Sequence, residues 1–508
     1  MLRVIFNATL SKIQKMIKGV EMSAIRLKSL FLKNKTFRQI IFKNTFWLVI
    51  SAIIRQVVSF VVVILIARHF GPVIYGKLVF GLSFVGLFAV AMDFGFSYLV
   101  VREVARHKEK SSQYIDNIIL IKFILSLIGL SLIAVVINLL GKEADVIRLV
   151  YFLGIYTVIN TFTVFFYSIF RANEQMQYET VCAVFQSLGL LGLVGFLIAG
   201  SGSLVSISFA YIGSTVVGIV LSLIFVRKYF SRFLLKVNLS ICWKLLKQVW
   251  PFGLTFIFIS GYYHTDVIML YVMKSDIAVG WYGAAHRFLL LLIGIPSLLQ
   301  GVFFPRLSHA FISSKDKFKN VFNHFLRYIF IISFPICIGV MLLSGRLILL
   351  VYGRTFEQSI LVLQMLIWSF LFAAIGGAFG SALNSSDRQI ALMKITGAAF
   401  GANILLNLML IPRFSYMGAV FATNLTRFFV ISIEAVLLYR IGFLPGAINY
   451  WKIWIKIISS TAVMGIFIVL FKEINLFILM PFAALIYFSL LYLMKGLNIA
   501  RTVKDQNG

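Results

Sequence analysis

The most constraining feature of this sequence is the recurrence of apolar segments about 20 residues long, separated by short polar interruptions. A segment of this length spans a bilayer as an α-helix, which satisfies all its backbone hydrogen bonds internally. The pattern differs from the alternating strands of an outer-membrane barrel. With 61% hydrophobic and 13% charged residues, the chain is far more apolar than a soluble protein, in which about a quarter of the residues are charged. The sequence therefore predicts an all-α polytopic membrane protein.

We expect about fourteen transmembrane helices. Charge tests this number, because cytoplasmic loops are enriched in Lys and Arg. If both termini are cytoplasmic, most of the 47 basic residues fall in inner loops. This distribution predicts an even number of spans with both termini inside. The topology also explains the net charge of +30, so binding to nucleic acid is not needed to account for it. The expected spans are 46–67, 76–96, 116–139, 147–170, 179–200, 204–226, 250–273, 284–305, 326–350, 358–383, 389–411, 416–438, 452–471 and 475–494.

An internal repeat divides these spans into two halves. GPVIYGKLVF (71–80) and VGWYGAAHRF (279–288) share a Tyr-Gly pair, and each opens an even-numbered span. FYSIFRAN (166–173) and FGSALNSS (379–386) resemble each other at the exits of spans 4 and 10. Six spans separate the matching segments, so the halves share one orientation. The predicted organisation is an N-terminal six-helix bundle 46–226, a basic cytoplasmic linker 227–249, a C-terminal six-helix bundle 250–438, an added two-helix hairpin 452–494 and a cytoplasmic tail 495–508.

Residues 1–45 alternate basic and apolar side chains, a pattern typical of an amphipathic arm on an anionic cytoplasmic leaflet. A disordered basic extension, or a start at Met16 or Met22, explains the same pattern. The stretch lacks a compact apolar region followed by a cleavage site, so we expect the first span to act as the insertion signal.

Ionisable residues inside the spans are the candidate functional residues, because a charge at the bilayer centre costs roughly 2.5–3.5 kcal/mol. Arg55 and Arg427 lie near the middle of spans 1 and 12. A guanidinium binds two phosphate oxygens at once, which favours a positively charged cavity for an anionic lipid headgroup. The alternative is a structural ion pair with Asp93, Asp266 or Glu434.

Four further positions have competing interpretations. Lys122 is a third substrate-binding candidate, but it lies near a span end, as Asp93 does, where snorkelling or helix capping also explains a charge. Asp266 is a proton or cation site, a counter-charge for an arginine, or a structural hydrogen-bond acceptor. Glu434 and Asp93 are further counter-charge candidates.

Catalytic chemistry is not indicated. No nucleotide-binding glycine motif, metalloprotease motif or serine-hydrolase motif occurs. Cys182, Cys242 and Cys337 are scattered and lack metal-ligand spacing, so we interpret them as small apolar side chains. We expect no catalytic residues, metal or cofactor, although a membrane-embedded glycan polymerase or ligase remains an alternative.

Several segments together resemble a known family. They are RHFGPVIYG (68–76), MDFGFSYLVVREVAR (92–106), FRANEQMQY (170–178), TDVIMLYVM (265–273) and IPSLLQGVFFPRLS (295–308). In this order, and with about fourteen spans, the chain resembles the polysaccharide-unit or O-antigen flippases of the multidrug/oligosaccharidyl-lipid/polysaccharide exporter superfamily.

The resemblance implies two six-helix bundles in a V around a central cavity, with two extra C-terminal helices. It implies a flippase of the cell membrane that moves a polyprenyl-pyrophosphate-linked oligosaccharide from the inner to the outer leaflet by alternating access. Glycosyltransferases and a glycan polymerase of the same pathway would be partners, besides membrane lipids. Arg55 and Arg427 map by position onto the cationic cavity of such flippases. Multidrug members use an acidic cation site in the first helix, where this chain has Arg55, so the resemblance favours the flippase over the alternative, a cation-coupled multidrug or metabolite exporter.

Overall fold

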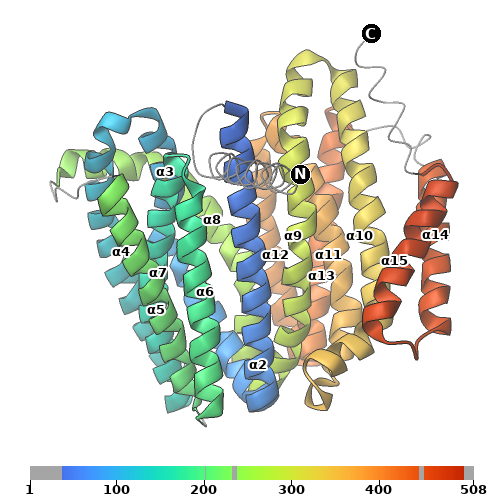
Figure 1. Ribbon diagram of the computed structural model, residues 1–508, viewed down its shortest axis with the longest axis horizontal. Coiled ribbons are helices and arrows are strands. Elements are labelled where there is room, and N and C mark those ends of the chain that lie inside the picture. The colour runs from blue at the N-terminus through green and yellow to red at the C-terminus, as the bar shows by residue number, and fades with distance from the viewer. Residues whose placement is uncertain (1–36, 201, 231–236, 445–450, 497–508) are drawn as a thin grey trace, which may run out of the picture.

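The computed structural model describes residues 37–200, 202–230, 237–444 and 451–496 (Figure 1). In these residues the chain forms fourteen α-helices and two short 3₁₀ helices, and no strand is present. The all-α class predicted from the sequence is confirmed. Most of the expected N-terminal arm and of the C-terminal tail lies outside the described residues.

The first helix, α2 (Phe37–Asp93), contains a sharp reversal at Gly71. Gly71 has φ 74° and ψ 179°, a combination open only to glycine, and Pro72 follows it. The kink separates two arms that correspond to the first two expected spans. We call the end of the molecule that contains Gly71 the kink end, at the bottom of Figure 1, and the opposite end, where α2 begins, the terminal end.

Thirteen stretches of the described residues are long and apolar enough to cross a membrane. The first is Phe42–Arg106, which has 65 residues and includes both arms of α2. At about 1.5 Å per residue its contour is roughly three times the ~30 Å of a bilayer core. It therefore accounts for two crossings, and the expectation of about fourteen transmembrane helices is confirmed.

The remaining helices follow one another through short turns. They are α3 (Phe96–Arg106), α4 (Ser111–Leu139), α5 (Ala144–Ala172), α6 (Met176–Ala199), α7 (Leu204–Tyr229), α8 (Leu239–Met273), α9 (Asp276–Ser313), α10 (Lys315–Val351), α11 (Ser359–Ser385), α12 (Gln389–Phe414), α13 (Tyr416–Arg440), α14 (Trp451–Leu470) and α15 (Leu476–Leu493), with 3₁₀ helices at Lys108–Lys110 and Arg354–Phe356.

Helix α8 begins well before the span expected at residue 250. The Asn238 side chain caps it by accepting hydrogen bonds from the backbone N–H groups of Ser240 and Ile241. Leu245 and Val249 are buried in an apolar cluster shared with α3, α4 and α5. Much of the segment predicted as a linker is therefore helical and packed against the N-terminal half.

Figure 1 shows α4 to α7 grouped on one side, α10, α11 and α13 on the other, and α2 and α9 between them. We call α2–α7 the N-terminal half and α8–α13 the C-terminal half. Helices α2 and α9 pack along each other, and one large apolar cluster includes residues of both halves. The hairpin α14–α15 packs on α10 through a separate cluster that includes Ile331, Ile457 and Tyr487. This arrangement agrees with two bundles and an appended hairpin.

Candidate functional site

A cluster of charged residues in the N-terminal half contains Arg55. Arg171 donates two hydrogen bonds to the carboxylate of Glu179, at 2.7 and 2.6 Å. A guanidinium nitrogen of Arg55 lies 4.0 Å from the same carboxylate. The Glu179 side chain is fully buried, whereas those of Arg55 and Arg171 are 40% and 39% exposed. Two accessible guanidinium groups thus share one buried carboxylate, which leaves an excess positive charge.

The seam between α2 and α9 runs beside Arg55. The Gln56 side chain donates to the carbonyl oxygen of Leu290 at 3.1 Å. One turn further along α2, the Ser59 hydroxyl accepts a hydrogen bond from the guanidinium of Arg287. Arg287 is a basic residue that we did not include among the candidates. Helix α9 begins at Asp276, whereas the expected span begins at 284. Arg287 therefore lies three turns inside the helix and not at its start, where a basic side chain would reach water.

A second polar cluster lies in the C-terminal half around Asp266, which is only 5% exposed. Its carboxylate accepts hydrogen bonds from Asn407 at 2.7 Å, from Tyr282 at 3.1 Å and from the Thr423 hydroxyl. Asn407 also donates to Asn403 at 3.0 Å. The five residues come from α8, α9, α12 and α13, so the cluster ties together four helices.

This cluster has hydrogen-bonding capacity left over. Buried Asn407 Oδ1 and Asn403 Nδ2 have no hydrogen-bond partner within the described part of the chain. One carboxylate with amide and hydroxyl oxygens is a donor set that suits a hard cation of low charge. In the described residues, no group of three or more His, Cys, Asp or Glu side chains offers a transition-metal site.

Arg427, on α13, is 7% exposed and lies near the Asp266 cluster. Its Nη1 donates to the carbonyl oxygen of Ser369 at 3.0 Å, and its guanidinium carbon lies 5.8 Å from the centre of the Tyr262 ring. Its Nε is buried without a hydrogen-bond partner in the described residues. No ion pair within 4.0 Å joins Arg427 to a described carboxylate, so neither Asp266 nor Glu434 pairs with it directly.

The other predicted positions lie apart from these clusters. Lys122 has no exposed side-chain surface; it forms an ion pair with Asp93 and lies 5.8 Å from the ring centres of Phe162 and Phe165. Asp93 also accepts a hydrogen bond from Ser97 at 2.6 Å. Glu434 is 3% exposed, and its Oε2 has no partner in the described residues.

The two halves meet most tightly at the kink end. A Cβ atom added at Gly76 would overlap the carbonyl oxygen of Asp276, and one added at Gly280 would overlap that of Pro72. The two Tyr-Gly segments that suggested the repeat therefore lie close to this contact, where backbones approach at a distance that only glycine allows. The contact closes this end of the seam.

Charged side chains reinforce the same closure. Arg68 of α2 donates to the carbonyl oxygens of Leu350 and of Val351, the latter at 2.7 Å, at the end of α10. Lys77 of α2 contacts Asp276 at 3.6 Å and forms an ion pair with Glu143. The hydrogen bond and positive charge of Lys77 hold the pKa of the Glu143 carboxyl below its usual range. The hydrogen bonds of Arg68 and the contact between Lys77 and Asp276 would break if the halves separated at this end, whereas the Lys77–Glu143 pair lies within the N-terminal half.

A family model described as polysaccharide biosynthesis protein matches residues 41–311, and a second, described as MatE, matches residues 251–409. A "Putative O-antigen transporter" of Shigella flexneri is 23% identical over 398 residues, which cover 75% of this chain and 93% of that protein. A "Probable low-salt glycan biosynthesis flippase" of Haloferax volcanii is 21% identical, covering 84% of this chain and 88% of that protein.

Solved structures share the fold at low sequence identity. The lipid II flippase MurJ in an inward closed conformation superposes with a TM-score of 0.74 at 14% identity, covering 89% of this chain and 99% of that one. An inward-facing multidrug resistance MATE family transporter superposes with a TM-score of 0.62 at 14% identity, covering 76% of this chain and 95% of that one.

Proposed function

This chain belongs to the polysaccharide biosynthesis protein family, and from this premise we propose that it is a glycan flippase of the cell membrane. Its substrate is an oligosaccharide unit attached to a polyprenyl pyrophosphate, and it moves that unit from the cytoplasmic to the outer leaflet. Both curated relatives, whose names give O-antigen transport and glycan biosynthesis, support this assignment. Glycosyltransferases supply the substrate and a glycan polymerase uses it.

The observation that carries the proposal is the Arg55 cluster. Two accessible guanidinium groups, anchored on the buried carboxylate of Glu179, offer several N–H donors and an excess positive charge. A pyrophosphate needs such donors to replace its hydration when it leaves water. Arg171 fixes the carboxylate, and Arg55 remains available for the phosphate. Arg287, on the facing helix, is a second phosphate contact in this proposal.

We assign different roles to the remaining candidates. Buried Arg427 joins α13 to α11 through the carbonyl oxygen of Ser369 and places a positive charge near the Asp266 cluster. Lys122 and Asp93 form a structural pair that joins the end of α2 to α4. We propose domain limits of 46–226 and 250–438 for the bundles and 452–494 for the hairpin.

The closed kink end supports alternating access. If both termini are cytoplasmic, as the basic loops predict, the kink end faces outward, and the contacts at Gly76, Gly280, Arg68 and Lys77 close the outer side. Transport would break these contacts and close the terminal end instead. Moving net negative charge outward is favourable by about 2.3 kcal/mol per charge per 100 mV of inside-negative potential, so export proceeds without ATP.

We assign a cation site to the Asp266 cluster. Asp266, Asn403, Asn407 and Thr423 would hold a monovalent cation, whose charge would neutralise the buried carboxylate. Occupancy would favour one arrangement of α8, α12 and α13, because these helices supply the oxygens. The same cluster favours the second candidate function, a cation-coupled multidrug or metabolite exporter, and the MatE model covers four of its five residues, all except Thr423.

The experiment uses a bacterial strain whose surface glycan depends on this chain. Deletion should cause lipid-linked glycan units to accumulate on the cytoplasmic face, and the chain supplied on a plasmid should restore them to the outer leaflet, measured with a membrane-impermeant lectin. Drug hypersensitivity with normal surface glycan would favour the cation-coupled exporter. Polymer lengths that change while translocation stays normal would favour the membrane polymerase or ligase.

A further inference from the structure

A cavity of about 560 Å³ lies on the outer flank of the C-terminal half, away from the Arg55 cluster. It is enclosed by α10 and α11 on one side and by the start of α14 on the other. Ten of its eleven lining residues are hydrophobic, and the eleventh is Arg327. Its volume falls within the roughly 300–1,000 Å³ typical of pockets that bind small molecules.

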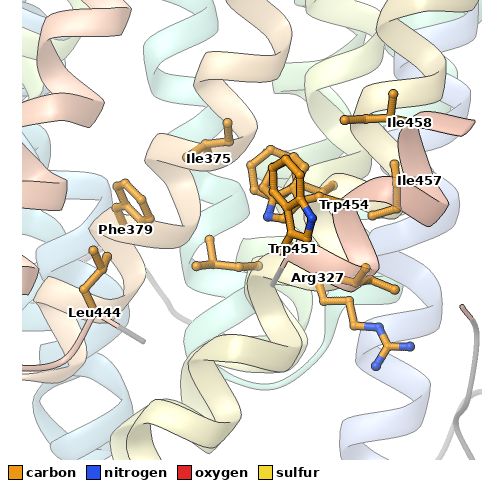
Figure 2. Close-up of a pocket in the computed structure, with 11 residues that line it drawn as sticks. Arg327, Ile375, Phe379, Leu444, Trp451, Trp454, Ile457 and Ile458 are labelled. Carbon is orange, nitrogen blue, oxygen red and sulfur yellow. The ribbon is translucent and has the colours of Figure 1, made fainter. Parts of the chain in front are cut away.

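The cavity walls are apolar, and four of the eleven lining side chains are aromatic. Figure 2 shows Ile375 and Phe379 across the cavity from Ile457, with the indole rings of Trp451 and Trp454 between them. The ring of Trp454 packs against that of Phe330, with centroids 3.9 Å apart. Such walls bind hydrocarbon and exclude a polar headgroup.

Arg327 carries the one charge on this lining. Its guanidinium lies at the edge of the cavity and points away from the indole rings (Figure 2). One Nη atom donates to the carbonyl oxygen of Gly496, and no described carboxylate lies within ion-pairing distance of it. A guanidinium has five N–H donors, so most of its donors are free to bind an anion at the rim.

The depth of the cavity agrees with an amphiphilic ligand. Trp451 begins α14 and is 70% exposed, and Trp454 lies one turn further in. Tryptophans concentrate at the level of lipid headgroups. The cavity mouth therefore lies at the headgroup level of the leaflet at the terminal end, with the apolar walls extending toward the bilayer centre.

We propose that this cavity binds an anionic membrane phospholipid, with an acyl chain between α11 and α14 and the phosphate on Arg327. A single guanidinium matches the single negative charge of a phosphodiester headgroup. The transported glycolipid is a poorer match, because its pyrophosphate needs more than one cation and the Arg55 cluster lies on α2, α5 and α6. The bound lipid would fill the gap between the hairpin and the C-terminal half. This site is independent of the transported substrate.

Binding can be measured on the detergent-purified full chain by native mass spectrometry with phosphatidylglycerol and phosphatidylcholine of identical acyl chains. We expect the wild type to retain phosphatidylglycerol about tenfold more strongly, the factor that ~1.4 kcal/mol produces. Arg327→Glu should abolish this preference, and Arg327→Lys should keep most of it. Arg346→Glu is the matched control, because Arg346 is likewise an arginine of α10 that donates to a backbone carbonyl of the C-terminal segment, that of Lys472, but it does not line the cavity.

The position of the acyl chain can be tested separately by fluorescence. Phosphatidylglycerol with brominated acyl chains should quench part of the tryptophan emission, and a Trp451→Phe/Trp454→Phe variant should lose that quenched part. Equal retention of both lipids by the wild type, or an equal loss in Arg346→Glu and Arg327→Glu, would overturn the proposal. Displacement of phosphatidylglycerol by a polyprenyl phosphate would also overturn it, by assigning the cavity to the transported lipid.

Discussion

The two polar clusters differ in how their charges are balanced and exposed. In the N-terminal half, Arg55 and Arg171 share one carboxylate and remain about 40% exposed. In the C-terminal half, the Asp266 carboxylate is buried and its partners are neutral amide and hydroxyl groups. Exposed excess charge is available to a large ligand, whereas a buried carboxylate with neutral partners suits an ion without its water shell.

The two clusters lie on helices that correspond to each other in the repeat predicted from the sequence. In that repeat, the first arm of α2 and α6 correspond to α8 and α12. Arg55 and Glu179 lie on the first pair, and Asp266 and Asn407 lie on the second. Corresponding helices thus carry the proposed anion site in one half and the proposed cation site in the other. If both proposals hold, the chain has divided substrate binding and ion binding between its halves.

The largest expected effect is that of Arg55→Ala on glycan export. Loss of a hydrogen-bonded charge costs about 1.5–3 kcal/mol, so export should fall roughly ten- to a hundredfold while protein abundance stays unchanged. Arg55→Lys should restore export only in part, because lysine lacks the planar fork. The measurement is outer-leaflet glycan in the complemented strain, with exposed Arg148→Ala as the control. Full export by Arg55→Ala would remove the proposed phosphate site.

Arg171→Ala tests whether Arg171 anchors the Glu179 carboxylate while Arg55 binds the substrate. The substitution leaves the fully buried Glu179 without its bidentate partner, but Arg171 is 39% exposed and Arg55 remains 4.0 Å from the carboxylate, so we expect a loss of about 1–3 kcal/mol. We therefore expect a lowered Tm and low abundance, in contrast to Arg55→Ala. Thermal unfolding in detergent measures this, and the second substitution Glu179→Gln should recover part of the Tm. An unchanged Tm in Arg171→Ala would contradict the anchoring role.

The C-terminal cluster should respond to ions instead. A cation that binds only the folded state stabilises it by RT ln(1 + [L]/Kd), about 2.7 kcal/mol at 100 Kd. Replacing choline chloride by sodium chloride should raise the Tm of the wild type and not that of Asp266→Asn or Thr423→Val. Arg55→Ala should respond like the wild type. If Asp266→Asn keeps the full sodium response, the carboxylate has a structural role only.

The sequence predicted helices better than it predicted the composition of the site. Apolar length alone located the spans, because a bilayer leaves the backbone few alternatives. Arg55 and Asp266 stood out because a charge in a span is costly. Arg171, Glu179 and Asn407 were missed, because their roles come from contacts between helices distant in sequence. The early starts of α8 and α9 were missed because polar residues continue a helix beyond the membrane.

A smaller effect is expected from a steric change at the kink end. Gly280→Ala places a methyl group against the Pro72 carbonyl, and overpacking of this kind costs about 1–3 kcal/mol. The closed arrangement should become less populated, so a cysteine introduced at buried Tyr75 should react faster with an impermeant maleimide. Gly294→Ala, on the same helix with nothing within 4 Å of its Cβ, is the control. Equal labelling rates in the two variants would mean that the contact does not hold the halves together.

The smallest expected effect concerns Glu143, whose mostly exposed side chain forms an ion pair with Lys77. Because Lys77 lowers the pKa of this carboxyl, the pair stabilises the folded N-terminal half, to which both residues belong, above the unfolded-state pKa of about 4.3. That contribution is lost as the pH falls through the lowered folded-state pKa. The Tm of Glu143→Gln should therefore lie slightly below that of the wild type at pH 7, and the difference should vanish near pH 3. Glu473→Gln, at an exposed glutamate between α14 and α15, should show no such pH-dependent difference. If the Glu143→Gln difference persists at low pH, the effect comes from local packing, and the ion pair with Lys77 does not contribute to the stability of the N-terminal half.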